Sequence, residues 1–227
     1  RGNGKDTFHL TTDFESKTIR AASCFARAEK LKKEGYSPDV IISHPGWGES
    51  LFLKQVWPKS KLKIYCEFFY HTSGGDVGFD QEFEPKGDFH LPGVFLKNTN
   101  ILLHANEAHS CISPTKWQAS TFPNHIREKI SVIHDGIDTD IVAPNYDAIL
   151  NLGDSHQVSY KDEVITFVCR SLEPYRGFHI FMRSLPLLLK KRKTAKVLIV
   201  GDEGVSYGGQ PPDGYSWKSL LLEEIKP

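Results

Sequence analysis

The sequence predicts an α/β protein whose β-sheets are parallel. The first observation is the segment 164–204, which runs from a β-branched strand through a loop and an amphipathic helix to a second apolar strand and a glycine turn. Two strands joined by a helix form a right-handed unit in which both strands point the same way. The second observation is that short apolar strands and helical patterns alternate from residue 39 onwards. Such alternation is typical of parallel sheets covered by helices.

Length and composition describe a globular protein without a strong charge bias. The 227 residues suffice for one large core or two small ones, and 39% hydrophobic with 25% charged residues exclude a disordered chain. Because 28 Lys and Arg balance 28 Asp and Glu, no basic field favours binding to nucleic acid. We see no signal-peptide pattern and no apolar run long enough to span a bilayer, and we expect a cytoplasmic location.

The four cysteines are far apart in the sequence and include no CxxC pair. This spacing favours a reducing compartment over a disulfide framework or a zinc site. Cys66 and Cys169 fall within predicted buried strands, where we expect their thiols to behave as small apolar groups.

The first half of the chain predicts one long helix followed by alternating strands and shorter helices. The long helix is expected from about Phe14 to Glu34, with Asp13 as its N-cap and Gly35 as its stop. The later elements are strands 39–44, 63–69, 111–113 and 130–134, a short helix ending near residue 58, and helices 94–109 and 114–129, the last interrupted near residue 123. Between them, residues 70–92 form a long acidic, glycine-rich loop, a kind that is usually functional or mobile.

The second half predicts a hairpin at 143–162 and then the strand–helix–strand unit. Its helix, expected over 178–193, has apolar residues at helical spacing and the basic cluster Lys190–Lys193 at the negative end of the helix dipole. The second strand, 197–200, is a continuous apolar run, which predicts a strand covered on both faces. A last helix is expected from near Trp217.

Two motifs, in this order, carry a resemblance to a known family. The first is the segment 132–138 (VIHDGID). The second begins with Arg170 at the end of a strand, continues with Arg176 before Gly177, and ends with a helix and the turn 199–204 (IVGDEG). Together they resemble retaining glycosyltransferases of family 4, in which the second basic position is lysine or arginine. The resemblance implies the GT-B architecture of two Rossmann-like domains with parallel sheets.

The resemblance further implies how the chain divides. Residues 1–137 are expected to form the acceptor-side domain, without its first strand, and residues 138–227 the donor-side domain, truncated. A glycine-rich loop after the first strand and a pair of glutamates spaced eight apart, both typical of the family, are missing from the chain. We therefore expect the sequence to be part of a longer enzyme and to be incomplete on its own.

The donor site is expected in the second domain. The resemblance implies that Arg170 and Arg176 bind the diphosphate of a nucleotide sugar and act catalytically, and that the glycine turn lies beneath the donor. The donor residues implied in that turn are Gly201, Glu203 and Gly204. Arginine suits the role because its planar, permanently charged fork can hold two phosphate oxygens while negative charge develops on the leaving group. Two surface arginines in ordinary ion pairs, for example with Glu173, remain the alternative.

The acceptor site is expected where the strands of the first domain end. The candidate residues are His44, Gly46, Trp47, Glu49 and Glu67. Glycine lets the backbone approach a ligand, Trp47 offers a ring for stacking on a sugar, and His44 or Glu49 can bind hydroxyl groups or move a proton. Many family members have a histidine where this chain has Glu67. A tight turn with a partly buried Trp47 and a histidine bonded to a backbone carbonyl remains an equal alternative.

The resemblance implies a retaining transfer of a hexose-type unit from a nucleotide sugar to a carbohydrate or lipid-linked acceptor, as part of carbohydrate biosynthesis. No cofactor and no metal are expected, since the chain shows no convincing metal-ligand pattern and the family generally needs none. Two alternatives stay open: a non-catalytic module that binds a glycan or a partner, and a GT-B phosphorylase or epimerase. Contact of Lys190–Lys193 with an acidic membrane surface is an alternative to a solvated helix end.

Overall fold

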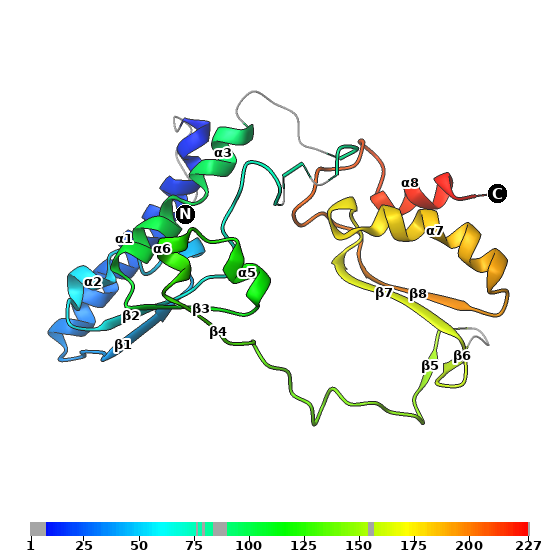
Figure 1. The fold of residues 1–227 in the computed structure, drawn as a ribbon, viewed down its shortest axis with the longest axis horizontal. Coiled ribbons are helices and arrows are strands. Elements are labelled where there is room, and N and C mark those ends of the chain that lie inside the picture. The colour runs from blue at the N-terminus through cyan, green and yellow to red at the C-terminus, as the bar shows by residue number, and fades with distance from the viewer. Residues whose placement is uncertain (1–7, 76, 79, 84–89, 154–156, 227) are drawn as a thin grey trace. The chain divides into compact units, whose positions relative to one another are not determined.

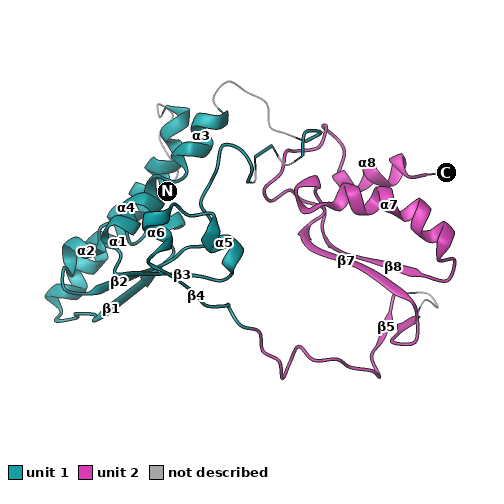
Figure 2. Cartoon of the chain, in the orientation of Figure 1, with its two compact units in different colours: residues 1–136 teal, residues 137–227 magenta. Residues whose placement is uncertain are grey.

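The computed structural model describes residues 8–75, 77, 78, 80–83, 90–153 and 157–226 (Figure 1). The chain separates into two compact units, residues 1–136 and 137–227, which are coloured teal and magenta in Figure 2. Each unit contains a parallel sheet, so the predicted α/β class with parallel strands is confirmed.

Unit 1 is built on a four-stranded parallel sheet in the order β1-β2-β3-β4. Its strands are β1 (Val40–Ser43), β2 (Lys61–Tyr65), β3 (Ser110–Ser113) and β4 (Ile130–Val132). Its helical elements are η1 (His9–Thr11), α1 (Thr12–Lys33), η2 (Pro45–Trp47), α2 (Leu53–Val56), α3 (His90–Leu96), α4 (Thr99–Glu107), α5 (Lys116–Ser120) and α6 (Asn124–Arg127). Because all four strands are parallel, their carboxyl ends meet at one edge of the sheet.

The ends of α1 follow one sequence prediction and contradict another. The prediction that Asp13 is the N-cap is wrong, because the helix begins at Thr12, two residues earlier than expected, and Asp13 lies in its first turn, paired with Lys17. The predicted stop at Gly35 is confirmed. Gly35 has a φ of 90° and donates to the carbonyl of Lys32, while the next amide donates to the carbonyl of Leu31. This pair of bonds is a Schellman motif, which requires a left-handed residue that glycine adopts without strain.

Helices of unit 1 pack on one face of its sheet. The buried cluster comprises Ala28, Ile41, Val56, Trp57, Leu62, Ile64, Cys66, Ile101, Ala105, Ala108, Cys111, Phe122 and Ile126. In β1 the pleat is clear, since Ile41 is 8% exposed and its neighbour Ile42 is 71% exposed. The predicted helix 94–109 is two helices, α3 and α4. The break lies at Asn98, whose buried side chain bonds to the backbone of Tyr70 instead of facing solvent.

Unit 2 contains the predicted strand–helix–strand unit. Its elements are β5 (Ile149–Asn151), β6 (Gln157–Ser159), β7 (Val164–Ser171), η3 (Pro174–Arg176), α7 (Phe178–Lys191), β8 (Lys196–Asp202) and α8 (Trp217–Glu224). Strands β7 and β8 are parallel and joined through α7, whereas β5 and β6 form a separate antiparallel pair. Residues of α7 and α8 share one buried cluster, which consists of Leu172, Phe178, Met182, Leu185 and Leu221.

The prediction that β8 is covered on both faces is wrong. Val168 in β7 is 70% exposed and Val200 in β8 is 56% exposed. The reason is that α7 and α8 pack into the same cluster and so cover the same face of the sheet (Figure 1). For the same reason Cys169 is partly exposed, although it was expected to be buried, whereas Cys66 is fully buried and follows β2 directly. Within the described residues, no helix combines the length and the apolarity needed to cross a bilayer.

Candidate functional site

His44 and Glu67 lie together at the carboxyl ends of β1 and β2. His44 Nε2 is 3.0 Å from Glu67 Oε2, and the backbone N–H of Gly46 donates to His44 Nδ1 over 3.1 Å. Because Nδ1 accepts a hydrogen bond, the neutral ring carries its proton on Nε2 and donates it to Glu67. The turn that makes η2 therefore fixes both the tautomer of His44 and the direction of its bond to the carboxylate. The sequence named both residues but did not predict that they are bonded.

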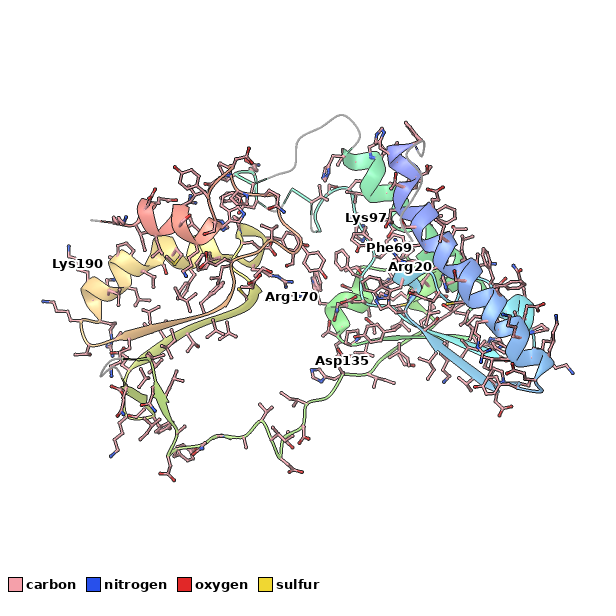
Figure 3. The ribbon with its side chains drawn as sticks, turned by 180° about the vertical axis from the view of Figure 1, so that it is seen from behind. Arg20, Phe69, Lys97, Asp135, Arg170 and Lys190 are labelled. Carbon is pink, nitrogen blue, oxygen red and sulfur yellow. The ribbon has the colours of Figure 1, made fainter. Side chains whose placement is uncertain are left out.

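Tyr65 and Asp135 extend this group along the same edge of the sheet, and the sequence did not identify them as a pair. The Tyr65 hydroxyl donates to the two carboxylate oxygens of Asp135 over 2.8 and 3.0 Å. Burial, together with this hydrogen bond and the negative charges of Asp135 and Glu67, raises the pKa of Tyr65 to about 12. The Tyr65 ring lies 5.7 Å from the ring of His44, so the two hydrogen-bonded pairs are in contact. Figure 3 labels Asp135, which follows β4.

The turn after β1 presents an exposed indole. Trp47 is 59% exposed, its ring lies 6.0 Å from that of His44, and its carbonyl accepts a hydrogen bond from Arg20 in α1 over 2.9 Å. Gly48 has a φ of 89°, and a Cβ at this position would lie 2.6 Å from the carbonyl oxygen of a residue in α1. Glu49 is exposed, and in the described part of the chain its carboxylate makes no hydrogen bond. Of these two candidate carboxylates, His44 therefore bonds to Glu67 and not to Glu49.

The segment that follows β2 is held in place by side chains from neighbouring helices. The backbone N–H of Phe69 donates to Thr121 Oγ1 over 3.1 Å. The backbone of Tyr70 exchanges two hydrogen bonds with the side chain of Asn98, of 2.9 and 2.8 Å, and Asn98 is 2% exposed. Glu67 therefore lies just before a segment whose backbone is held at two residues, and its carboxylate is oriented by the bond to His44.

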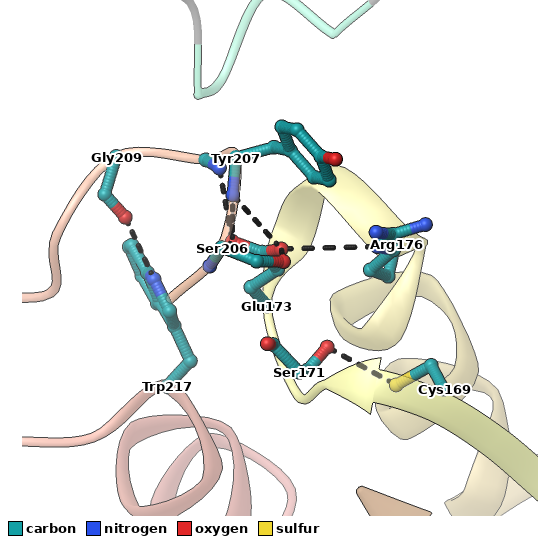
Figure 4. Close-up of polar contacts among 9 residues, drawn as sticks. Cys169, Ser171, Glu173, Arg176, Ser206, Tyr207, Gly209 and Trp217 are labelled. Carbon is teal, nitrogen blue, oxygen red and sulfur yellow. Dashed lines mark hydrogen bonds and ion pairs between the residues drawn. The ribbon is translucent and has the colours of Figure 1, made fainter. Parts of the chain in front are cut away.

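The two candidate donor arginines of unit 2 lie at the end of β7 and in η3. The strand pairing shifts between Val168 and Ser171, so a bulge falls where Arg170 lies. A bulge re-aims the side chains next to it. Arg170 is exposed, and among the residues that the structure describes it makes no hydrogen bond or ion pair. Arg176 has two neighbours: its Nε is 3.8 Å from Glu173 Oε1, and its guanidinium carbon is 5.1 Å from the centre of the Tyr207 ring (Figure 4).

Glu173 is a buried carboxylate, not the surface partner that the ion-pair alternative assumed. Its side chain is 0% exposed, and it accepts hydrogen bonds from the Ser206 hydroxyl and from the backbone N–H groups of Ser206, Tyr207 and Gly208. Burial alone would raise the pKa of this carboxyl, but the hydrogen bonds outweigh burial and hold the pKa below its usual value. Sequence reasoning missed this role.

The predicted glycine turn 201–204 begins inside β8, which extends to Asp202, so Gly201 is a strand residue and its small size is explained by packing. A Cβ on Gly201 would lie 2.9 Å from the carbonyl oxygen of Cys169 and 2.9 Å from Leu172 Cδ2. The N–H of Gly204 donates to the side chain of Asp202 over 3.0 Å. Glu203 faces solvent and pairs with Lys218 over 2.7 Å, a bond that, with one from Ser216, lowers the pKa of Glu203.

Comparison with known proteins gives a family for the chain. The model of the glycosyl transferase family 4 group matches residues 1–142 of the 227, a stretch that includes His44, Tyr65, Glu67 and Asp135. No curated protein matches the chain. The match covers more than half of the sequence, and the parallel α/β sheets are those of a Rossmann-like GT-B enzyme. The chain therefore belongs to the glycosyl transferase family 4 group.

Proposed function

We propose that this glycosyltransferase moves a hexose-type sugar from a nucleotide sugar to a carbohydrate or lipid-linked acceptor, with retention of anomeric configuration. Residues 138–227 serve as the donor side and residues 1–137 as the acceptor side. The observation that carries the proposal is Arg170, an exposed arginine without a protein partner in the described residues, at the carboxyl end of β7 and six positions before Arg176.

The chemistry of the donor explains why two arginines are needed. When the sugar leaves, negative charge grows on the diphosphate, and fixed positive groups that meet this charge lower the barrier. Arg176 is 3.8 Å from Glu173, longer than the 2.7–2.9 Å typical of a charge-assisted hydrogen bond, so its guanidinium keeps N–H groups for a phosphate. The two guanidinium groups supply the positive charge, and we expect transfer to proceed without a metal ion or another cofactor.

The acceptor side is proposed at the His44–Glu67 pair. His44 donates to one oxygen of Glu67, and the Glu67 side chain is 59% exposed, so its carboxylate can accept a hydrogen bond from an acceptor hydroxyl. Trp47 offers an exposed ring to a sugar beside it. Glu67→Gln keeps the size of the side chain but weakens its bond to a hydroxyl. It should raise KM for the acceptor, with little change in affinity for the donor nucleotide.

Titration calorimetry of UDP, GDP and their sugars tests the donor site. We expect Arg170→Ala/Arg176→Ala to weaken binding at least about 100-fold, because hydrogen bonds to charged groups contribute about 1.5–3 kcal/mol each. Lys190→Ala/Lys191→Ala is the matched control, since it removes two positive charges from the same unit and should bind like the wild type. Equal binding by the wild type and the double arginine variant contradicts the proposal. Turnover with inorganic phosphate in place of an acceptor would instead identify a phosphorylase.

A further inference from the structure

A short loop of unit 2, residues 205–209, is anchored by a single buried side chain. Glu173 Oε1 accepts from the Ser206 hydroxyl over 2.7 Å, and Glu173 Oε2 accepts from the N–H of Gly208 over 2.9 Å and of Ser206 over 3.2 Å. The N–H of Tyr207 is 3.3 Å from both oxygens. A buried carboxylate that meets so many donors is both charged and fixed in direction.

The far end of the same loop is tied to α8. The indole N–H of Trp217 donates to the carbonyl of Gly209 over 3.0 Å, and α8 begins with a capping box between Ser216 and Ser219. Gly208 packs tightly, since a Cβ there would lie 3.1 Å from Glu173 Oε2 and 3.3 Å from Tyr175 Cβ. The loop is therefore held at both ends and packed closely against its anchor (Figure 4).

The consequence of this anchoring is the position of an exposed aromatic ring. Tyr207 is 65% exposed, yet its ring lies 5.1 Å from the guanidinium carbon of Arg176 and 5.9 Å from the ring of Tyr175. The electron-rich face of a tyrosine ring attracts a guanidinium group. Glu173 approaches the Nε of the same guanidinium, so one carboxylate both holds the loop and contacts the arginine. In the described residues the terminal nitrogens of Arg176 make no hydrogen bond or ion pair, so their N–H groups stay available to a ligand.

We propose that Glu173 and Tyr207 are positioning residues for Arg176, which they hold in the direction needed to bind the donor diphosphate. The proposal rests on the donor role of unit 2 proposed above, and it adds two residues that do not themselves touch the donor. It predicts that the ring at position 207 matters and that its hydroxyl group does not.

The test compares Tyr207→Ala with Tyr207→Phe in the full chain, with Tyr215→Ala as a control. Tyr215 is an exposed tyrosine of the loop before α8 and is 52% exposed. The first readout needs no ligand: NMR signals of the Arg176 side chain should be shifted upfield by the ring in the wild type, Tyr207→Phe and Tyr215→Ala, and should lose this shift in Tyr207→Ala. The second readout is calorimetry with UDP and GDP, where Tyr207→Ala should bind about two- to five-fold more weakly and Tyr207→Phe should restore affinity.

Glu173→Gln tests the positioning role separately from the Tyr207 variants, because it weakens the bonds that hold the loop but keeps the tyrosine at position 207. We expect it to reduce the upfield shift of Arg176 and to weaken binding of UDP or GDP. An unchanged Arg176 signal in Tyr207→Ala, or nucleotide binding that needs Arg176 but not a ring at position 207, overturns the positioning role. Failure of the wild-type chain to bind UDP or GDP contradicts the donor site itself, so the two outcomes are distinguishable.

Discussion

Replacing Glu173 by glutamine tests the anchor of unit 2 with little change in shape. The substitution keeps one acceptor oxygen and replaces the other by an NH2 group. The amide is expected to turn so that its NH2 faces the Ser206 hydroxyl, which can rotate to accept a hydrogen bond. The three backbone N–H groups of residues 206–208 cannot reverse their role and must share the remaining oxygen.

The expected loss of stability follows from these contacts. Each of the three backbone bonds changes from charge-assisted to neutral, a loss of about 1 kcal/mol each, or about 3 kcal/mol together. A buried neutral amide costs less to desolvate than a buried carboxylate, and this offsets part of the loss. We therefore expect Glu173→Gln to lower the free energy of unfolding of unit 2 by about 2 kcal/mol.

Trp217 provides a local reporter for this measurement. Its indole N–H bonds to the loop, and it is the single tryptophan of residues 137–227. Urea unfolding followed through the Trp217 indole NMR signal gives the stability of unit 2, and hydrogen exchange of the same N–H should become faster in the variant. Glu223→Gln, an exposed change in α8, is the control and should stay within about 0.5 kcal/mol of the wild type. An equally small change in the free energy of unfolding for Glu173→Gln would refute the role of Glu173 as the anchor of the loop.

The pH dependence of stability tests the same anchor independently. Because the pKa of Glu173 is lower in the folded state than in the unfolded state, its contribution to the free energy of unfolding is fully present above the ordinary glutamate pKa of about 4.3. The contribution is lost as pH falls through the lowered value. The stability difference between the wild type and Glu173→Gln should thus be largest near pH 7 and shrink at about pH 3. A difference that grows on acidification contradicts the assignment.

Two further predictions concern unit 1. Tyr65 should ionise near pH 12 in an absorbance titration. Asp135→Asn should bring the pKa of Tyr65 closer to 10, because it removes the negative charge that accepts the hydrogen bond. Ionisation of Tyr65 near pH 10 in the wild type would contradict the Tyr65–Asp135 contact. Gly48→Ala should destabilise unit 1 by about 2–3 kcal/mol, because its Cβ would meet Lys17 and its φ is positive. Gly35→Ala, with a φ of 90° but no atom within 4 Å, should cost about 1 kcal/mol, and equal losses in urea unfolding would contradict the steric argument.

The parts of the fold that the sequence predicts are those set by strong local patterns. The crossover helix α7 follows from apolar residues at helical spacing, and the strands beside it follow from β-branched runs. The stop of α1 follows from a glycine at the one position that needs a left-handed residue. These signals lie within a few residues of the feature that they determine, so they can be read without knowing the tertiary contacts.

The features that the sequence did not predict depend on contacts between distant segments. The partners of Glu173 lie 33–35 residues further along the chain, in a loop without periodicity. Tyr65 and Asp135 are 70 residues apart, and only the parallel order of the strands brings them to one edge. The exposed face of β8 was likewise not predictable, because an apolar run does not show on which side of the sheet the helices pack. His44 and Glu67 were chosen as candidates because both follow strands, which is a positional signal that the sequence does carry, and the structure shows that they are bonded.

The most direct test of the donor site is a crystal structure of the chain with UDP or GDP bound. We expect diphosphate oxygens to lie within about 2.7–3.2 Å of guanidinium nitrogens of both Arg170 and Arg176. We also expect the Tyr207 ring to stay against Arg176, as it does without a ligand. A diphosphate bound elsewhere, or held without either arginine, would contradict the central claim that unit 2 binds the nucleotide-sugar donor through these two side chains.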